Sequence, residues 1–331
     1  MSKKLIIISI LLIVLGLVIS VGALALTQFN FDELTGRVSK TYDIEGEFDN
    51  IECDLGVANI NILLSNDNKN SALCIETDRS QFEFEVVNNT LKVKEIYKKV
   101  WIGISTQADV TLFLSKDIYN KLIINGSTGE VSISDAFKFK NCDIDISTGD
   151  IEFMAQVEEN LNIKLSTGDT SIYKVNTTNL NIECSTGRVL IQETNIADTL
   201  YLKRSTGKSI LENITIGNKL TVNGTTGDLN IDKLSAKDAK IKLSTGDCNL
   251  TDFVISGDLN LETSTGDVRL NSCDAANMEI KTDTGSVKGT ILTNKIFDVN
   301  SDTGKISHPD TYTGGMCKIT TDTGSVTIEY K

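Results

Sequence analysis

Acidic side chains recur at one place of a repeated tetrapeptide, and this series of carboxylates is the first feature of the sequence that could carry chemistry. Stacked one repeat apart, such carboxylates could bind calcium or basic polymers through their oxygens. Their separation would also approach the roughly 5–5.5 Å between the two carboxyl groups of a retaining glycosidase. The positions are Asp150 and Asp169 in one segment and Asp228, Asp247 and Asp267 in another.

The distribution of these acids favours a structural role. In the last three repeats the acid moves from the fourth to the first position, as Asp283, Asp302 and Asp322, and no repeat has an acid at both. Like charges about 5 Å apart repel by roughly 0.8 kcal/mol even in water, so the partition limits repulsion while capping turns. The G-G-x-G-x-D motif of calcium-binding β-rolls is absent. We therefore predict no catalytic residue, no cofactor and no resident metal, with the acidic stripe as the only candidate cation surface.

Histidine and cysteine offer little further chemistry. His308 is the only histidine, so a Ser-His-Asp or Cys-His mechanism would depend on it alone. We predict a structural loop residue, and the irregular segment 308–315 is the best candidate for a local binding loop. Of the seven cysteines, five fall at inward places of the repeat, never in one column on adjacent repeats, which predicts free, buried thiols. These five are Cys53, Cys142, Cys184, Cys248 and Cys317; Cys273 falls at a corner and Cys74 is unplaced.

The element that positions these residues is an S/D-T-G-x repeat whose glycines lie 19 or 20 residues apart. A fixed period over eleven copies is typical of stacked repeat architectures. Glycine suits a sharp corner because it reaches positive φ without steric cost. The predicted corner glycines are Gly129, Gly149, Gly168, Gly187, Gly207, Gly227, Gly246, Gly266, Gly285, Gly304 and Gly324.

Alternating apolar residues flank each glycine. They lie seven and five residues before it, as Leu161 and Ile163 do, and two and four after it, as Val189 and Ile191 do. Period-two alternation on both sides predicts two half-buried strands per repeat. Stacking at about 4.8 Å per rung would bury the apolar faces in one core. The predicted fold class is all-β, a parallel β-solenoid (β-helix).

The N-terminus predicts a membrane anchor. Lys3 and Lys4 precede the apolar run 5–26, which is long enough to cross a bilayer with the positive flank inside. A cleaved signal peptide ending near Ala23-Leu24-Ala25 is the alternative, although its apolar region usually has only about 7–15 residues. The expected organisation is an anchor at 1–26, a linker at 27–42, irregular rungs and a cap at 43–125, and a regular solenoid at 126–331.

Both ends of the solenoid should differ from its middle. Near the start, Gly56 is expected to be the corner of an irregular rung, and Asn88-Asn89 reads as a hairpin turn with Trp101 in a later strand. At the other end the strand 327–331 has nothing after it, which predicts an uncapped edge open to a partner unless side chains such as Lys331 protect it.

The repeated S/D-T-G-x turns behind one apolar segment resemble the LiaG-like family of bacterial putative adhesins, over about residues 45–331. The resemblance implies a β-solenoid, a cell-envelope location and an adhesive or accessory role, and it brings no functional residues. The net charge of −13 argues against nucleic acid as a partner.

We predict a single-pass membrane protein whose extracellular domain is structural or interacting rather than enzymatic. Its partners would be the membrane, through residues 5–26, and an envelope polysaccharide or another envelope protein. The alternatives are a carbohydrate-active β-helix enzyme and an accessory sensor of envelope stress.

Overall fold

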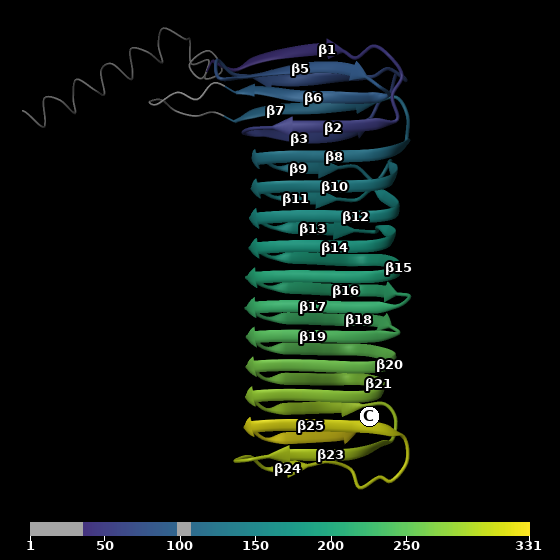
Figure 1. Cartoon of the computed structure of the whole chain (residues 1–331), viewed down its shortest axis with the longest axis vertical. Helices are drawn as coiled ribbons and strands as arrows, with labels where there is room; N and C mark the ends of the chain where they lie inside the picture. Colours follow the sequence, from purple (N-terminus) through teal and green to yellow (C-terminus); the bar gives the residue numbers. More distant parts are fainter. Residues whose placement is uncertain (1–35, 98–106) are drawn as a thin grey trace, which may run out of the picture.

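The computed structural model describes residues 36–97 and 107–331, which form a long stack of rungs (Figure 1). These residues contain 26 strands in one continuous hydrogen-bonded sheet. Within these two ranges no helix is suited to crossing a bilayer, and the apolar run 5–26 and Trp101 lie outside them. The predicted parallel β-solenoid is confirmed.

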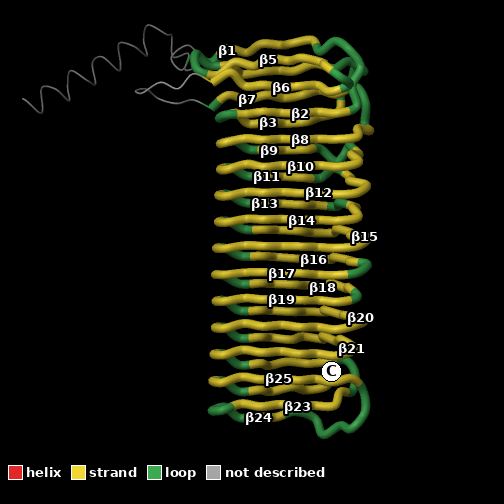
Figure 2. Tube along the Cα trace, in the orientation of Figure 1, coloured by secondary structure: helices red, strands yellow, loops and turns green. Residues whose placement is uncertain are grey.

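Two strands meet at every Thr-Gly corner, and the strands before and after the corner form opposite faces of the rod (Figure 2). The regular part is parallel throughout, as in the pairing of β10 with β8 and β12. Its strands are β8 (Ile118–Thr128), β9 (Val131–Ile133), β10 (Lys138–Thr148), β11 (Ile151–Phe153), β12 (Gln156–Thr167), β13 (Thr170–Tyr173), β14 (Asn176–Thr186), β15 (Val189–Thr206), β16 (Ser209–Ile216), β17 (Lys219–Thr226), β18 (Leu229–Ala236), β19 (Asp238–Thr245), β20 (Cys248–Thr265), β21 (Val268–Thr284) and β22 (Val287–Ile291).

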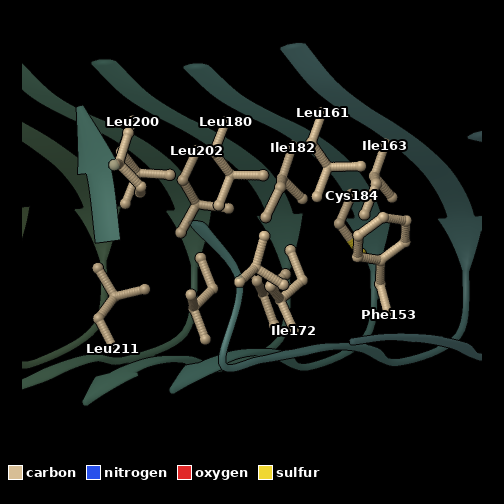
Figure 3. Packing of buried hydrophobic residues seen from close by; sticks show 14 of the residues in the cluster. Phe153, Leu161, Ile163, Ile172, Leu180, Ile182, Cys184, Leu200, Leu202 and Leu211 are labelled. Atoms are coloured by element: carbon tan, nitrogen blue, oxygen red, sulfur yellow. The ribbon is translucent and has the colours of Figure 1, made fainter. Parts of the chain in front are cut away.

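The core is a column of apolar side chains enclosed by the two faces (Figure 3). Leu161 and Ile163 continue into the equivalent pairs of the next rungs, and Ile172 and Leu211 face them from the opposite strands. These side chains are buried, so the inward places predicted from the alternation are confirmed. Each rung is sealed only by its neighbours, which is why a single repeat cannot form a core.

The corner glycines stack directly on one another. Gly149 has φ of 135°, and a Cβ placed there would lie 2.0 Å from the carbonyl oxygen of Gly129. No side chain fits at that distance, and the glycine Cα–H instead lies against the preceding carbonyl as a weak C–H···O contact. In addition, the N–H of Gly149 donates to the carbonyl of Thr167 on the next rung at 2.9 Å. Glycine is therefore required by close approach as well as by φ.

The last two rungs stack in the reverse of their chain order. They consist of β23 (Lys295–Ser301), β24 (Ile306–Ser307), β25 (Gly315–Thr323) and β26 (Val326–Tyr330). β25 pairs with both β21 and β23, and β26 pairs with both β22 and β24. The C-terminal segment is thus inserted between two earlier rungs, and the outermost rung is 295–307 (Figure 1). The edge predicted at 327–331 is covered in part, because β26 pairs with β22 along its whole length and with β24 only at Val326 and Thr327.

The inward side chains explain this order. The C-terminal rung directs Cys317, Ile319, Val326 and Ile328 into the core, and all four are buried. In the rung formed by β23 and β24, the last of these inward places is taken by His308, four residues after Gly304. Burying an imidazole between two apolar rungs would cost free energy unless it were hydrogen-bonded. Placing this rung outermost avoids that cost.

The N-terminal end shows the same kind of insertion. Its strands are β1 (Val38–Asp43), β2 (Asn50–Leu55), β3 (Ala58–Leu64), β4 (Ser71–Glu76), β5 (Ser80–Val87), β6 (Thr90–Tyr97) and β7 (Ala108–Leu114). The rung β2–β3 lies between β8–β9 and β6–β7, and the antiparallel strands β1, β4 and β5 cover the end. Strand β1 overlaps the segment 27–42 that was expected to be a linker. The hairpin turn at Asn88-Asn89 is confirmed, with φ of 50° and 60°.

The first corner was placed two residues too early. Ile60 pairs with Val131 and Cys53 with Ile124, which puts Ala58, not Gly56, at the corner place. Apolar alternation runs from Ile51 to Ile62, so both registers fit the pattern and the glycine was a misleading marker. In the structure Glu95 accepts hydrogen bonds from the N–H groups of Gly56 at 2.6 Å and Val57 at 2.8 Å, which completes this end corner.

The glycine stack predicts a large effect of a single methyl group. In Gly207→Ala the new Cβ would lie 1.9 Å from the Gly187 carbonyl oxygen, at a φ of 129°. We expect the free energy of unfolding in urea to fall by about 3 kcal/mol. Ser205→Ala in the same corner, which is exposed, is the control and should change it by less than about 0.5 kcal/mol. Equal stability of the two variants would contradict the close stack.

The inverted rung order predicts a specific cross-link. Met278 and Cys317 are register partners on adjacent parallel strands, which lie about 4.8 Å apart, within the Cα range of a disulfide. Met278→Cys should therefore form a disulfide with Cys317 on oxidation, detected by mass spectrometry. In the control Met278→Cys/Phe297→Cys/Cys317→Ala the two new thiols are two rungs apart and should stay reduced. A 278–297 disulfide in that control would show stacking in chain order.

Candidate functional site

The acidic stripe is built from carboxylates that cap the next corner. In each case one carboxylate oxygen accepts a hydrogen bond from the backbone N–H at the equivalent place one rung on. The distances from N to Oδ1 are 2.7 Å for Asp169 to Asp150, 2.8 Å for Arg188 to Asp169, 3.0 Å for Asp247 to Asp228, 3.0 Å for Asp267 to Asp247 and 2.9 Å for Ser286 to Asp267. The stripe thus satisfies backbone donors that the turn leaves free.

Arginine side chains occupy much of the remaining acceptor capacity. Arg269 donates from Nη1 to Asp247 Oδ2 at 2.6 Å and from Nη2 to Asp267 Oδ2 at 2.8 Å. Arg188 Nη2 lies 3.3 Å from Asp169 Oδ2. The role of Arg269 was not predicted, although its place two residues after Asp267 on an outward strand position puts both on one face.

These contacts change the titration of one member of the stripe. The pKa of Asp247 is lowered, first by the hydrogen bond from the Arg269 side chain and then by the backbone N–H of Asp267. Arg269 responds in the opposite sense, with its pKa raised chiefly by Asp247. A carboxylate held ionised in this way acts as a cap and ion-pair partner, not as a proton donor.

The grouping and titration of the acidic side chains bear on whether the stripe could hold a metal ion or act as an acid. Within residues 36–97 and 107–331, no three or more His, Cys, Asp or Glu side chains are grouped to hold a metal ion. A retaining glycosidase needs one carboxyl with a raised pKa as its general acid. Where a carboxyl pKa departs clearly from its ordinary value in this part of the chain, it is lowered, as at Glu159, Asp247 and Glu262. Attraction of cations or basic polymers to the stripe stays a prediction.

The cysteines are free and buried, as predicted. Burial raises the pKa of Cys317 to about 12 and that of Cys273 to about 11, so both remain protonated thiols at neutral pH. Cys273, predicted at a corner, and Cys74, which was unplaced, are also inside the core. These side chains act as small apolar groups.

One buried charge was not anticipated. Arg204 is 2% exposed at an inward place, and its Nη2 donates to the carbonyl oxygen of Gly227 at 3.0 Å. A Cβ on Gly224 would lie 2.7 Å from Leu243 Cδ2 and 3.4 Å from this nitrogen, so that glycine provides room chiefly for Leu243. Burial lowers the pKa of Arg204. Its Nε and Nη1 have no hydrogen-bond partner in the described part of the chain, so the buried guanidinium is only partly satisfied.

A groove along the rod has the geometry of a binding surface. The groove has a volume of about 660 Å³ and runs across successive rungs on the side where the chain passes from one rung to the next. Val157, Thr177 and Ile196 lie at its base. One wall is a ladder of amides. Asn176 Nδ2 donates to Gln156 Oε1 at 2.6 Å, and Asn195 Nδ2 donates to Asn176 Oδ1 at 3.0 Å. Polar groups thus recur along the groove at the rung spacing, about 4.8 Å.

The only histidine lies at the far end of the rod. His308 stacks on Phe297, with ring centroids 4.9 Å apart and planes 23° apart, and so covers part of the end of the core. The segment 308–315 connects the outermost rung back to β25. Its position beside the unpaired edges of β23 and β24 makes it part of the distal surface.

Comparison with known proteins places this architecture in a family. The model of the family described as Toastrack DUF4097 matches residues 48–199 and 195–261. No curated protein matches the chain.

Among solved structures, the chain is similar to a "putative adhesin" from Bacteroides fragilis NCTC 9343, with 16% identity, 89% of this chain and 97% of that chain covered, and a TM-score of 0.27. It is similar to a "putative adhesin" from Parabacteroides merdae ATCC 43184, with 14% identity, coverage of 76% and 95%, and a TM-score of 0.43. It is also similar to a "putative lipid binding protein" from Parabacteroides distasonis ATCC 8503, with 17% identity, coverage of 77% and 94%, and a TM-score of 0.41.

The lowered pKa of Asp247 predicts a defined acid sensitivity. Because the folded pKa lies below the unfolded value of about 3.9, the stability that Asp247 contributes is present above about pH 4 and is lost as the pH falls through the folded pKa. Asp247→Asn should therefore flatten the fall in melting temperature between about pH 4 and pH 2. Asp302→Asn on the outermost rung is the control. An unchanged acid slope in Asp247→Asn would contradict the ion pair with Arg269.

Proposed function

The chain belongs to the Toastrack DUF4097 family, and we propose that it is a membrane-tethered interaction protein of the bacterial cell envelope, a LiaG-like adhesin whose rod lies outside the membrane. Residues 5–26 anchor it, and the groove along the rod binds an envelope polysaccharide. The protein is not an enzyme. The amide ladder from Gln156 to Asn195 is the observation that carries this proposal.

The anchor and the rod support this arrangement together. The apolar run 5–26 follows Lys3 and Lys4, a charge distribution that favours an internal N-terminus. It precedes β1, which lies at the opposite end of the stack from the rung 295–307 (Figure 2). In the proposed arrangement that rung points away from the bilayer. Stacked repeats typically bind along extended surfaces, and such a rod offers one from its capped end to its distal end.

The groove combines an apolar base with side-chain amides on one wall, which fits both the faces and the hydroxyl groups of sugar rings. Its wall presents side-chain amides, which can both donate to and accept from sugar hydroxyls. These amides are already aligned by their hydrogen bonds to each other, so binding would order few further side chains. Because they repeat with the rungs, a polymer with a similar repeat length meets an equivalent group at each step.

Replacing the amide ladder tests this function. Full-length protein in vesicles should co-sediment with purified envelope polysaccharide, and Asn176→Ala/Asn195→Ala should bind at least about fivefold more weakly. The control is Asn230→Ala/Asn249→Ala, which removes another stacked amide pair, with an Nδ2 to Oδ1 distance of 2.9 Å, away from the groove.

Two results would contradict the proposal. Failure of the unaltered protein to bind, or equal weakening by both double variants, would remove the groove as the binding surface. Release of sugar fragments that stops in Asp228→Ala would show an enzyme.

A further inference from the structure

The outermost rung has two strand edges without partners in the described part of the chain. β23 pairs only with β25, and β24 pairs only with β26. Each edge therefore presents backbone N–H and C=O groups to solvent, a template for another strand. At the opposite end of the rod the edge strands β1 and β5 also have one partner each in the described part, so the two ends differ in their exposed side chains and not in having strand edges.

Apolar surface is concentrated at the same end. Five of the ten large apolar side chains exposed in the described residues lie between 292 and 316. Ile296 is 40% exposed, Ile306 41% and Tyr312 84%. Phe297 and Val299 are only half-buried, although their equivalents on the next rung, Cys317 and Ile319, are fully buried. An open core end beside unpaired edges marks an interaction surface.

The residues of β23 fit a second copy of the same strand. In an antiparallel pair centred on Val299, Phe297 faces Ser301 of the other copy, and Asp298 faces Asn300 of the other copy twice, by symmetry. Asp298 and Asn300 are exposed on the outward face, where the amide can donate to the carboxylate. A pair centred on Asp298 would instead oppose two carboxylates, which is destabilising.

We propose that the distal rung binds the distal rung of a second copy, end to end, by antiparallel pairing of β23 centred on Val299. The contact extends both apolar cores across the interface and satisfies both open edges. It is isologous, so it closes as a dimer and does not propagate. This assignment deepens the proposed envelope function and rests on it, because rods anchored in facing membranes meet at their distal ends.

An exchange of two residues tests the pairing register. Vesicles carrying the full-length chain should cluster, as measured by light scattering, without added polysaccharide. In Asn300→Asp, the Asp298 carboxylate of each copy faces a second carboxylate on the other copy. This repulsion should weaken clustering roughly tenfold. Asp298→Asn/Asn300→Asp restores the opposition of amide and carboxylate and should restore clustering. The control, Asn223→Asp, makes the same change in the same column of the rod's middle and should have no effect.

Each contrary outcome contradicts a different part of the proposal. Absence of clustering by the unaltered chain overturns the self-association. Clustering that Asn300→Asp leaves unchanged, or that the exchanged double variant fails to restore, overturns it in favour of another partner strand or the capped end of a neighbouring copy. None of these results affects polysaccharide binding in the groove, so the proposed function and this inference can fail separately.

Discussion

The contact between stacked corner glycines is the constraint on which the rest of the rod depends. Each glycine Cα lies so close to the preceding carbonyl that no Cβ fits, which places every corner directly over the last. Once the corners coincide, the strands on both sides are in register, and the inward places form continuous columns. The same alignment brings the carboxylate oxygen of Asp228 to the N–H of Asp247. The core and the acidic ladder are both consequences of one backbone contact.

A polar side chain occupies an inward place in the rung at or next to each end of the rod. His308 lies in the outermost rung, where one side is open, and Glu95 lies in the rung next to β1, β4 and β5, where it completes the corner at Gly56 and Val57. At both ends one rung lies between two others that are not its neighbours in chain order: β2–β3 lies between β6–β7 and β8–β9, and β25–β26 lies between β21–β22 and β23–β24. The result is a rod with one covered end and one open end. That asymmetry gives the protein a direction, with the anchor at one end and an exposed core at the other.

Much of this structure could be predicted because one rung specifies the next. The 19- or 20-residue spacing and the alternation around residues such as Leu161 predict the solenoid, its corner glycines and its buried thiols. The order of the last rungs could not be predicted, because the segments 295–308 and 315–330 place apolar residues at the same positions relative to their glycines. Only His308 makes the first of them less suited to the core. The first corner was predicted at Gly56 for a related reason, since the apolar alternation around it fits two registers. The contacts of Arg269 with Asp247 and of Arg204 with Gly227 depend on neighbours one rung away, which a linear pattern does not show.

Hydrogen exchange at the distal end tests the central claim most directly, because it reports which rung opens first. If stacking order rather than chain order governs the end, amides of β25 and β26 should exchange more slowly than those of β23 and β24, although β26 lies at the C-terminus. Fastest exchange in residues 315–330, with protection of 295–307, would contradict the inserted rung and the open distal end derived from it.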